Sequence, residues 1–454
     1  MILLLERAAD EAPDHPAVVT EGATTTYGDL RAHARRVASG LLAHDVARFA
    51  IVEPDACRIV QLLAGAALVG SEPCQYQADI APAEFAAQAA SLDHDVVVTR
   101  RTDLAGPFRV IDPDDLAGAE PDDRPVPGDG QPLLIRTTGT TGVPKAARHD
   151  WSILGRTVAN LSPRPAQRWL LAYGPHQFAG LQVLQHVLAS RATLVAPFPR
   201  QPRDGLDALL SAGVTCVSAT PTYWRFLLAE ARARQVALPA LEQITLGGEA
   251  SPADLLEELR TAFPDARISQ VYASTEFGSV ASVRDGLPGL DVGALFSDAN
   301  PTSNLRVREG ELWVRAGAGM LSYADGSSDM SGEWRRTGDQ VEIVGGRVLF
   351  RGRTSEVINV GGVKVHPLPV EQRINSLETV AAARVFGRAN RLTGAIVAAE
   401  VVLAPGSGSE DPEEVREQIR DAVADLPRAW QPRSVAFVDS IRTLGDKTVR
   451  RMEA

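Results

Sequence analysis

"VTCVSATPTYWRFLLAEARARQ" (residues 214–235) joins a β-rich run, 214–220, to a helix-like run, 223–235. The same order then repeats, because QITLGGE (243–249) precedes SPADLLEELRTAF (251–263), and ISQVYAS (268–274) is the next strand-like run. In SPADLLEELRTAF we expect Ser251 to cap the helix and Pro252 to take its first position. Alternating strands and helices predict a parallel sheet covered by helices, with ligands bound beyond the carboxyl ends of the strands.

The length of the chain and a change of pattern near residue 350 predict two domains. At 454 residues the chain is longer than one hydrophobic core usually supports. Its tail contains two strand-like runs, 380–387 and 395–404, and an amphipathic helix over 411–426. We therefore expect an α/β protein, with a large N-terminal domain of parallel-rich sheets and helices and a small α+β C-terminal domain.

Composition narrows the class of protein. The net charge of -11 argues against a nucleic-acid partner, which would require a basic surface. Neither the first ten residues nor the apolar run at 60–70 resembles a secretion signal or a membrane span, so we expect a cytoplasmic enzyme without a membrane partner. The three cysteines, Cys57, Cys74 and Cys216, match no metal template, and we expect them to be reduced and in the core.

Lysine is rare in this chain. Only three of the 46 basic residues are lysine, namely Lys145, Lys364 and Lys447. Arginine cannot replace lysine where a compact charge on a flexible stem is needed, so each of the three positions is a candidate for a specific role.

The segment RTTGTTGVPKAAR (136–148) has the composition of a phosphate-binding loop. Glycines let the backbone approach a ligand, and backbone N–H groups and threonine hydroxyls donate to phosphate oxygens. The segment is not a Walker loop, because Pro144 stands where glycine would precede the lysine, which argues against a P-loop kinase or ATPase. A solvated Gly/Thr turn is the alternative interpretation.

Five elements in order extend this observation: TTGTTGVPK (137–145), YASTEFGS (272–279), EWRRTGDQVEI (333–343), FRGRTSEVINVGGVKVHPLPVE (350–371) and RTLGDKTVRR (442–451). In this order they resemble the adenylate-forming superfamily of acyl-CoA ligases, nonribosomal adenylation domains and luciferases. The resemblance implies an N-terminal domain, 1–352, and a mobile C-terminal domain, 353–454. It also implies ATP with Mg²⁺, an acyl adenylate, and transfer to a second nucleophile.

The resemblance assigns the nucleotide site residue by residue. The residues that look like the loop around the β- and γ-phosphates are Thr137, Thr138, Gly139, Thr140, Thr141, Gly142 and Lys145. The residues that look like the rest of the nucleotide site are Gly248, Glu249, Tyr272, Thr275, Glu276, Asp339 and Arg353.

Within that second group the implied roles differ. Tyr272 and the Gly248–Glu249 turn would lie along the adenine, although a plain strand-ending turn fits Gly248 and Glu249 nearly as well. Thr275 would donate to the α-phosphate, and Glu276 would bind Mg²⁺. Asp339 would accept from the ribose hydroxyls, with Arg353 beside it.

Two positions depart from the family pattern. Ser355 stands at the hinge where Asp or Lys is common, and Asp446 separates Gly445 from Lys447. We still expect Lys447 to be the catalytic lysine that bridges the attacking carboxylate and the α-phosphate. A surface pairing of Lys447 with nearby acids is the alternative. Lys364, in GGVKVHP, reads as a solvated turn lysine.

The sequence indicates the acid substrate and the acceptor nucleophile less clearly than it indicates the nucleotide site. PHQFAGLQVL (175–184) resembles the family segment at the carboxylate pocket, with His176 and Phe178 at its mouth and Gly180 leaving room. Tyr223 and Trp224 fit either a pocket wall or an ordinary buried helix. We expect a small aryl or short acyl acid.

Three hypotheses for the overall function stay open. The first is adenylation of such an acid with transfer to a thiol such as coenzyme A, by a monomer or a homodimer. The second is adenylation of nitrite with transfer to an aromatic amine. The third is a nucleotide-binding homologue without catalysis.

Overall fold

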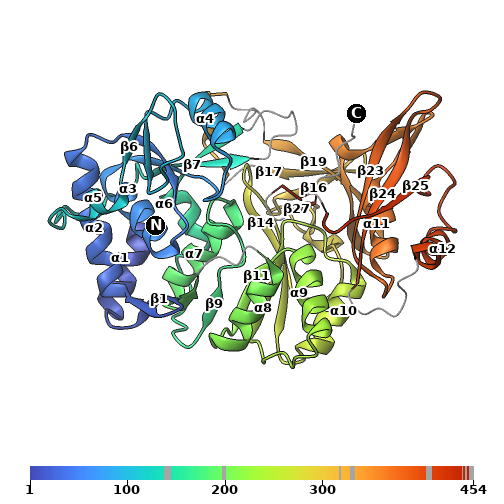
Figure 1. Cartoon of the computed structure of the whole chain (residues 1–454), viewed down its shortest axis with the longest axis horizontal. Coiled ribbons are helices and arrows are strands. Elements are labelled where there is room, and N and C mark those ends of the chain that lie inside the picture. The colour runs from blue at the N-terminus through green and yellow to red at the C-terminus, as the bar shows by residue number, and fades with distance from the viewer. Residues whose placement is uncertain are drawn as a thin grey trace.

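The computed structural model describes residues 1–137, 145–196, 201–315, 319–327, 333–404 and 412–441, together with the backbone of 443–444 and 447–448. It confirms the expected α/β class, with a large N-terminal domain of sheets and helices and a C-terminal α+β domain. The N-terminal domain occupies the part of Figure 1 drawn from blue through yellow to light orange, and the C-terminal domain is the deep orange and red part beside it.

An eight-stranded sheet contains the strand that was predicted over residues 214–220. Its strand order is β14-β13-β12-β11-β9-β10-β1-β2, and every neighbouring pair from β13 to β1 is parallel. The strands are β14 Gly278–Val283, β13 Arg267–Ser274, β12 Gln243–Gly247, β11 Cys216–Ala219, β9 Arg168–Leu170, β10 Thr193–Val195, β1 Pro16–Thr20 and β2 Ala23–Thr26. The predicted parallel sheet is therefore confirmed.

A seven-stranded sheet faces the first one across a layer of helices. Its order is β18-β8-β7-β4-β3-β5-β6, parallel from β7 to β6 and antiparallel at β7-β8 and β8-β18. The strands are β18 Ser322–Tyr323, β8 Lys145–Asp150, β7 Pro132–Thr137, β4 Glu72–Gln75, β3 Arg48–Val52, β5 Val96–Thr99 and β6 Arg109–Ile111. Strands β7 and β8 flank the threonine-rich segment, whose residues 138–144 lie outside the described part of the chain.

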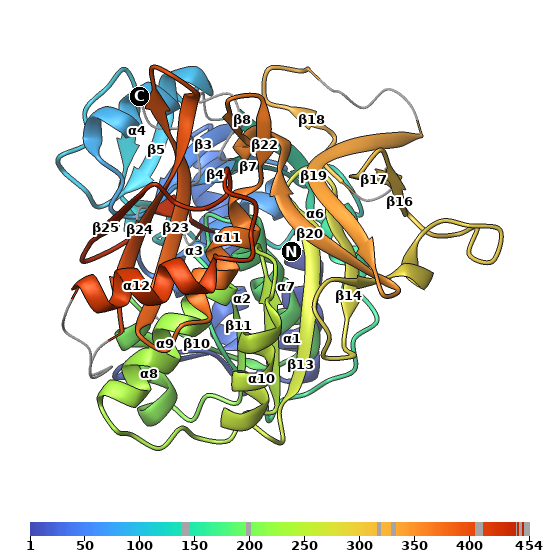
Figure 2. The same ribbon diagram turned by 90° about the vertical axis from the view of Figure 1, so that its right-hand side faces the viewer.

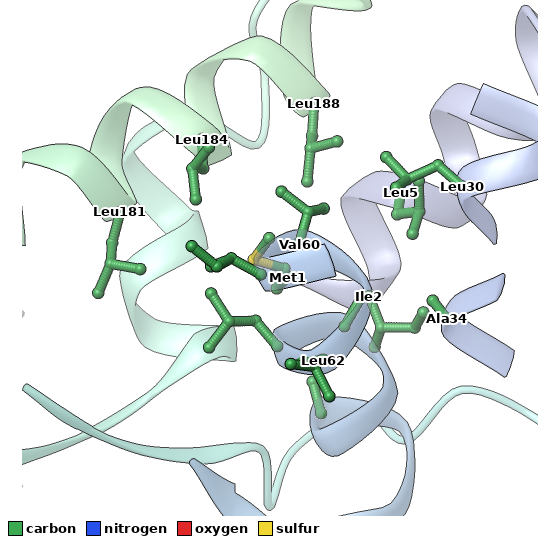
Figure 3. Packing of buried hydrophobic residues seen from close by; sticks show 14 of the residues in the cluster. Met1, Ile2, Leu5, Leu30, Ala34, Val60, Leu62, Leu181, Leu184 and Leu188 are labelled. Carbon is green, nitrogen blue, oxygen red and sulfur yellow. The ribbon is translucent and has the colours of Figure 1, made fainter. Parts of the chain in front are cut away.

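The layer between the two sheets forms the main core. It consists of helices α1 Ile2–Glu11, α2 Tyr27–Ala43, α3 Ala56–Val69 and α7 Phe178–Ser190. Figure 3 shows leucines of α7 packed with side chains of α1 and α3. Helix α2 begins where the Thr26 side chain accepts a hydrogen bond from the Asp29 amide.

Further helices cover the outer faces of both sheets. Helices α8 Pro202–Ser211, α9 Pro221–Ala233 and α10 Ala253–Ala262 bury their apolar residues against β11, β12 and β13. Helix α4 Pro82–Ser91 covers the other sheet. The short helices are α5 Pro113–Ala117, α6 Trp151–Leu154, and the 3-10 turns η1 Gly155–Thr157, η2 Val292–Ala294 and η3 Thr354–Glu356.

A five-stranded antiparallel sheet links the two domains. Its order is β15-β20-β19-β17-β16. The strands are β15 Leu290–Asp291, β20 Arg347–Arg353, β19 Trp334–Val344, β17 Glu311–Arg315 and β16 Leu305–Arg308. Strand β20 ends at Arg353, and the next strand along the chain belongs to another sheet.

That other sheet is the centre of the C-terminal domain, which faces the viewer in Figure 2. It has the order β22-β21-β24-β23, with β25 added parallel to β24, and α11 and α12 pack on it. The elements are β21 Ile358–Val360, β22 Val363–Val365, α11 Pro367–Asn375, β23 Val380–Asn390, β24 Gly394–Leu403, α12 Pro412–Ala422 and β25 Ser434–Phe437. The hairpin β26 Thr443–Leu444 and β27 Lys447–Thr448 follows.

Two helix boundaries differ from the prediction. Helix α10 begins at Ala253, so the cap is Pro252, which is extended (φ -78°, ψ 157°), and Ser251 makes no cap. Helix α12 ends at Ala422, not 426, although Val423 still packs in the domain core. Both differences lie at helix ends, which a local sequence pattern places least exactly.

The structure tests two expectations drawn from composition, namely the burial of the cysteines and the lack of a membrane-spanning segment among the described residues. Cys74 and Cys216 are buried as expected, whereas Cys57 is half-buried against the main core. Among the described residues, no helix combines the length and apolar character needed to cross a membrane.

Candidate active site

A cavity of about 1330 Å³ lies where the carboxyl ends of β7, β12 and β13 meet strands β19 and β20. Most of the described residues that the sequence proposed for the site line it: Thr137, Lys145, Phe178, Gly248, Glu249, Tyr272, Thr275, Glu276, Asp339 and Arg353. Helix α11, strand β23 and Ile441 of the C-terminal domain also line it, so the cavity lies between the two domains.

Asp339 is the most firmly held carboxylate of this site. The Tyr272 hydroxyl donates to its Oδ2 at 2.7 Å, and the Nε of Arg353 lies 3.1 Å from its Oδ1. Strand pairing explains the second contact, because Asp339 and Arg353 are cross-strand partners in β19 and β20. The Asp339 charge raises the pKa of Arg353, and burial followed by the same charge raises the pKa of Tyr272. The arrangement presents a fixed negative charge flanked by a phenol and a guanidinium.

An aromatic surface lies next to this group. The Tyr272 ring stacks on Phe350 of β20, with centroids 5.2 Å apart and planes 29° from parallel. A flat apolar surface beside a carboxylate suits a heteroaromatic base joined to a sugar with paired hydroxyls.

Thr275 and Glu276 occupy the tight turn between β13 and β14. The Ser274 hydroxyl accepts from the Phe277 amide at 3.1 Å, and the Glu276 carbonyl accepts from the Met320 amide at 2.9 Å. The turn is anchored by its backbone, which leaves the Glu276 carboxylate in the cavity, close enough to Arg353 to raise the pKa of that guanidinium.

Thr137 and Lys145 flank the threonine-rich segment as cross-strand partners in β7 and β8. The Lys145 ammonium lies over the Tyr323 ring, 4.7 Å from its centroid. The remaining predicted phosphate-loop residues lie outside the described residues: Thr138, Gly139, Thr140, Thr141 and Gly142. The structure thus places the two ends of the proposed phosphate loop at the cavity.

Glu249 lies in the turn that follows β12, after Gly248, whose φ of 83° is left-handed. Its carboxylate accepts from the amide and the hydroxyl of Thr222, at 3.1 and 2.6 Å, in the first turn of α9. A carboxylate at a helix N-terminus is stabilised by the unpaired amides there. The contact fixes the turn along one wall of the cavity.

The segment predicted to hold the acid carboxylate is only partly at the cavity. Phe178 lines it, but His176 and Gly180 are not among the described residues that do. The room left by Gly180 is filled by the Gly174 carbonyl, which would lie 2.2 Å from a Cβ at that position. Burial, followed by the charge of Arg136, lowers the pKa of His176 to about 4, so its imidazole is neutral near pH 7.

The C-terminal hairpin places the backbone of Lys447 opposite Leu444. Ile441, shortly before this hairpin, is buried and lines the cavity. Asp446 and the Lys447 side chain lie outside the described part of the structure. Lys364 is exposed in the β21-β22 hairpin, in agreement with the solvated-turn interpretation.

Two family models match this chain. The family model described as AMP-binding enzyme matches residues 5–323, and that of the AMP-binding enzyme C-terminal domain matches residues 369–444. The chain belongs to the AMP-binding enzyme family. This confirms the resemblance to adenylate-forming enzymes that five sequence elements indicated.

Two similar relatives are named as CoA ligases. A 4-chlorobenzoate–CoA ligase of Arthrobacter sp is 27% identical over 343 residues, which cover 69% of this chain and 65% of the relative, less than two thirds of its length. A 2-succinylbenzoate–CoA ligase of Bacillus subtilis (strain 168) is 26% identical over 434 residues, or 88% of this chain and 87% of the relative. The structure of an anthranilate CoA ligase in complex with anthranoyl-AMP has a TM-score of 0.84 at 20% identity, covering 99% of this chain and 95% of that one, and shares the fold.

Sequence reasoning assigned one pair of aromatic residues loosely and missed one wall of the cavity. Tyr223 and Trp224 pack in the core under α8 to α10, where Trp224 meets Phe263, so the buried-helix interpretation is correct and the pocket-wall interpretation is wrong. The missed wall consists of polar residues on one face of β11, β12 and β13, among them Ser218, Thr245 and Ser269. Their alternation with buried apolar residues was the available signal.

Proposed function

We propose that this member of the AMP-binding enzyme family is an AMP-forming ligase, which adenylates a carboxylic acid with ATP and transfers the acyl group to a thiol such as coenzyme A. The observation that carries the proposal is the grouping of Asp339, Tyr272 and Arg353 in the same cavity as Lys145 and Glu276. A site of this composition has an acceptor for ribose, an aromatic surface for a base, and cations for phosphates. The names of the relatives support the acid and thiol parts of the proposal.

The proposed nucleotide pose follows from the side chains. Asp339 accepts from the ribose hydroxyls, and Tyr272 lies beside the adenine. Thr137 and Lys145 hold the β- and γ-phosphates together with the loop that they flank. Charge-assisted hydrogen bonds to a fixed carboxylate give both affinity and orientation.

The cavity fits a magnesium ion that is shared with the nucleotide. Among the described residues no cluster of three or more His, Cys, Asp or Glu side chains forms a metal cage. Mg²⁺ usually takes one or two protein carboxylates and completes its shell with phosphate oxygens and water, so Glu276 alone suffices. When bound, the ion would supply charge neutralisation on the phosphate oxygens.

In the first half-reaction, a carboxylate oxygen of the acid attacks the α-phosphorus of ATP, and pyrophosphate leaves. Negative charge accumulates on the phosphoryl oxygens, where the Thr275 hydroxyl donates and the Lys447 ammonium supplies a cation. In the second half-reaction, a thiolate attacks the acyl carbon and AMP leaves.

We divide the chain into domains 1–352 and 353–454, because β20 ends at Arg353 and the C-terminal sheet begins at Ile358. Ser355 in the turn between them is the proposed hinge.

The test is pyrophosphate release over a panel of aryl, aliphatic and dicarboxylic acids and nitrite, each with and without coenzyme A or an aromatic amine. We expect release that depends on a carboxylic acid, with an acyl thioester identified by mass when coenzyme A is present. ATP that binds without cleavage under every condition would contradict the proposal and favour a nucleotide-binding homologue. Pyrophosphate release only with nitrite and an aromatic amine would contradict the proposal that the substrates are a carboxylic acid and a thiol.

A further inference from the structure

One face of the eight-stranded sheet is polar where a parallel sheet is ordinarily apolar. Strands in the middle of parallel sheets are usually apolar on both faces, because helices cover both. Here the residues of β11, β12 and β13 alternate: Val217, Ile244 and Ile268 pack under α8 to α10. Their neighbours Ser218, Thr245 and Ser269 face the cavity instead.

Helix α7 forms the opposite wall of this part of the cavity. Phe178, Gln182 and His186 recur at a spacing of four and all line it, so one stripe of the helix runs parallel to the polar face of the sheet. The lining of β12 extends from Gly247, next to the nucleotide site, back to Gln243 at the start of the strand. Four residues of strand correspond to about 13 Å. The cavity is therefore an elongated channel along the strands.

The far end of the channel is cationic. Arg164 and Arg267 line it, and both are exposed where it reaches the surface. Among the described residues, neither guanidinium has a carboxylate within ion-pair distance. The acid of this region is Glu242, whose carboxylate accepts from the Gln167 side chain at 3.2 Å.

The Arg267 side chain is positioned by a buried amide. Its Nε donates to Gln243 Oε1 at 2.7 Å, and Gln243 Nε2 donates to the hydroxyls of Ser269 and Thr245, at 3.0 and 3.1 Å. Gln243 is 5% exposed, so the amide that holds Arg267 has little contact with bulk solvent. One guanidinium edge is thereby fixed, and its remaining N–H groups can meet an oxyanion.

A histidine closes the same end. The His186 ring packs on Trp169, with centroids 4.7 Å apart. Burial, followed by the charges of Arg164 and Arg267, lowers the pKa of His186 to about 4. The imidazole is thus neutral near pH 7, and the two arginines carry the positive charge of this end.

We propose that the acid activated by this enzyme is elongated and carries a second anionic group, which Arg164 and Arg267 hold at the far end of the channel. The proposal rests on the adenylation proposed above and gives the substrate class: the first carboxylate lies at the nucleotide, and the second lies roughly 10 Å or more away. Where the chain between them carries polar groups, the side chains of the polar wall can hydrogen-bond to those groups. The small acid expected from the sequence would leave this end unused.

The test compares acids in pairs. Straight-chain dicarboxylic acids from hexanedioic to tetradecanedioic acid are each measured beside the monocarboxylic acid of the same length, by acid-dependent pyrophosphate release. We expect kcat/KM to favour the diacid by about tenfold or more at the matching length. The variants Arg164→Gln and Arg267→Gln lower kcat/KM for that diacid and leave the monoacid nearly unchanged. Arg203→Gln, an exposed arginine of α8, is the matched control and alters neither.

The outcomes separate this proposal from the adenylation itself. If the monoacids are turned over as well as the diacids or better, and Arg267→Gln does not change the ratio of kcat/KM between diacid and monoacid, the distal anion site is wrong while the adenylation proposal stands. If no acid causes pyrophosphate release, both proposals are contradicted. Arg267→Glu provides a second check, because it should move the preference toward acids with a distal amine. Thermal unfolding of each variant verifies that the exposed substitutions leave the fold intact.

Discussion

In the proposed nucleotide site, Asp339 is held between the Tyr272 hydroxyl and the Arg353 guanidinium. Asp339→Asn keeps the shape of the side chain but removes the negative charge that faces Arg353 and replaces one of the two acceptor oxygens with an NH2 donor. We predict a rise of about tenfold to a hundredfold in KM for ATP, with a smaller fall in kcat. The measurement is pyrophosphate release at saturating acid as a function of ATP concentration.

Tyr272→Phe is the control for this variant. It removes one hydroxyl and keeps the ring that stacks on Phe350, so we expect only a few-fold change. An unchanged KM for ATP in Asp339→Asn would show that the carboxylate does not meet the nucleotide.

Lys447 carries the proposed catalytic charge. Lys447→Ala should lower the rate of adenylation by about a hundredfold to a thousandfold without changing the thermal midpoint, because the cation stabilises the transition state. Lys364→Ala, in an exposed hairpin, should leave adenylation unchanged. Single-turnover formation of the adenylate measures both. Equal rates in wild type and Lys447→Ala would mean that Asp446 diverts the lysine to a surface pairing.

At the scale of the element, the start of α7 is packed so closely against the preceding turn that no side chain fits at Gly180. A Cβ on Gly180 would meet the Gly174 carbonyl at 2.2 Å, so the helix and the turn before it cannot both keep their places in Gly180→Ala. We predict a loss of about 1–3 kcal/mol in the free energy of unfolding, measured by urea denaturation, and weaker turnover because Phe178 moves with the helix.

Gly155→Ala is the matched control for that prediction. The nearest atom to a Cβ there lies 3.9 Å away, and its φ of -69° suits alanine. We expect stability to be unchanged or slightly higher. Equal stability losses in the two variants would show that the Gly180 contact is not what limits the helix.

The elements that sequence predicts best are those with a local signal. Helix α2 has a threonine cap, α9 begins at Pro221, and the strands around it have β-rich runs, so their existence follows from a short window of sequence. The start of α10 could not be placed in this way, because the local pattern favours Ser251 as the cap, whereas the cap in the structure is Pro252, which makes no side-chain cap hydrogen bond.

The polar wall of the channel required more than local pattern. Ser218, Thr245 and Ser269 alternate with apolar residues, which is the signature of a half-exposed strand. Three such strands side by side in a parallel sheet mark a cavity, but their adjacency depends on the strand order β13-β12-β11. The pattern was visible in the sequence, while its meaning was not.

At the scale of the molecule, four histidines make stability dependent on pH. Burial is the first cause that lowers the pKa values of His94, His149, His176 and His186, each from 6.5 to about 4. Below about pH 6.5 the unfolded chain binds protons that the folded chain does not, so the free energy of unfolding falls as the pH drops toward 4.

For the two fully buried rings, His94 and His149, we expect a loss on the order of 2–3 kcal/mol each over that range. Urea midpoints measured from neutral pH to about pH 4 test this. In His149→Gln, the free energy of unfolding should depend less steeply on pH, because one fewer proton is taken up on unfolding. A midpoint that stays constant over the range would contradict the buried neutral rings.

The assembled site is also a property of the whole chain. Tyr272 and Asp339 are 67 residues apart in sequence, yet their side chains share a hydrogen bond, and the cavity beside them takes a wall from the C-terminal domain. Family resemblance indicated which residues to group, whereas the channel and its cationic end emerged only when both sheets and helix α7 were in place.

The central claim is that this site joins a carboxylate to AMP before any thiol takes part. Exchange of labelled pyrophosphate into ATP, measured with acid present and thiol absent, tests it most directly. We predict exchange that requires a carboxylic acid and that falls by about a hundredfold to a thousandfold in Lys447→Ala. Exchange that never exceeds the acid-free background with any carboxylic acid, while ATP still binds, would contradict it.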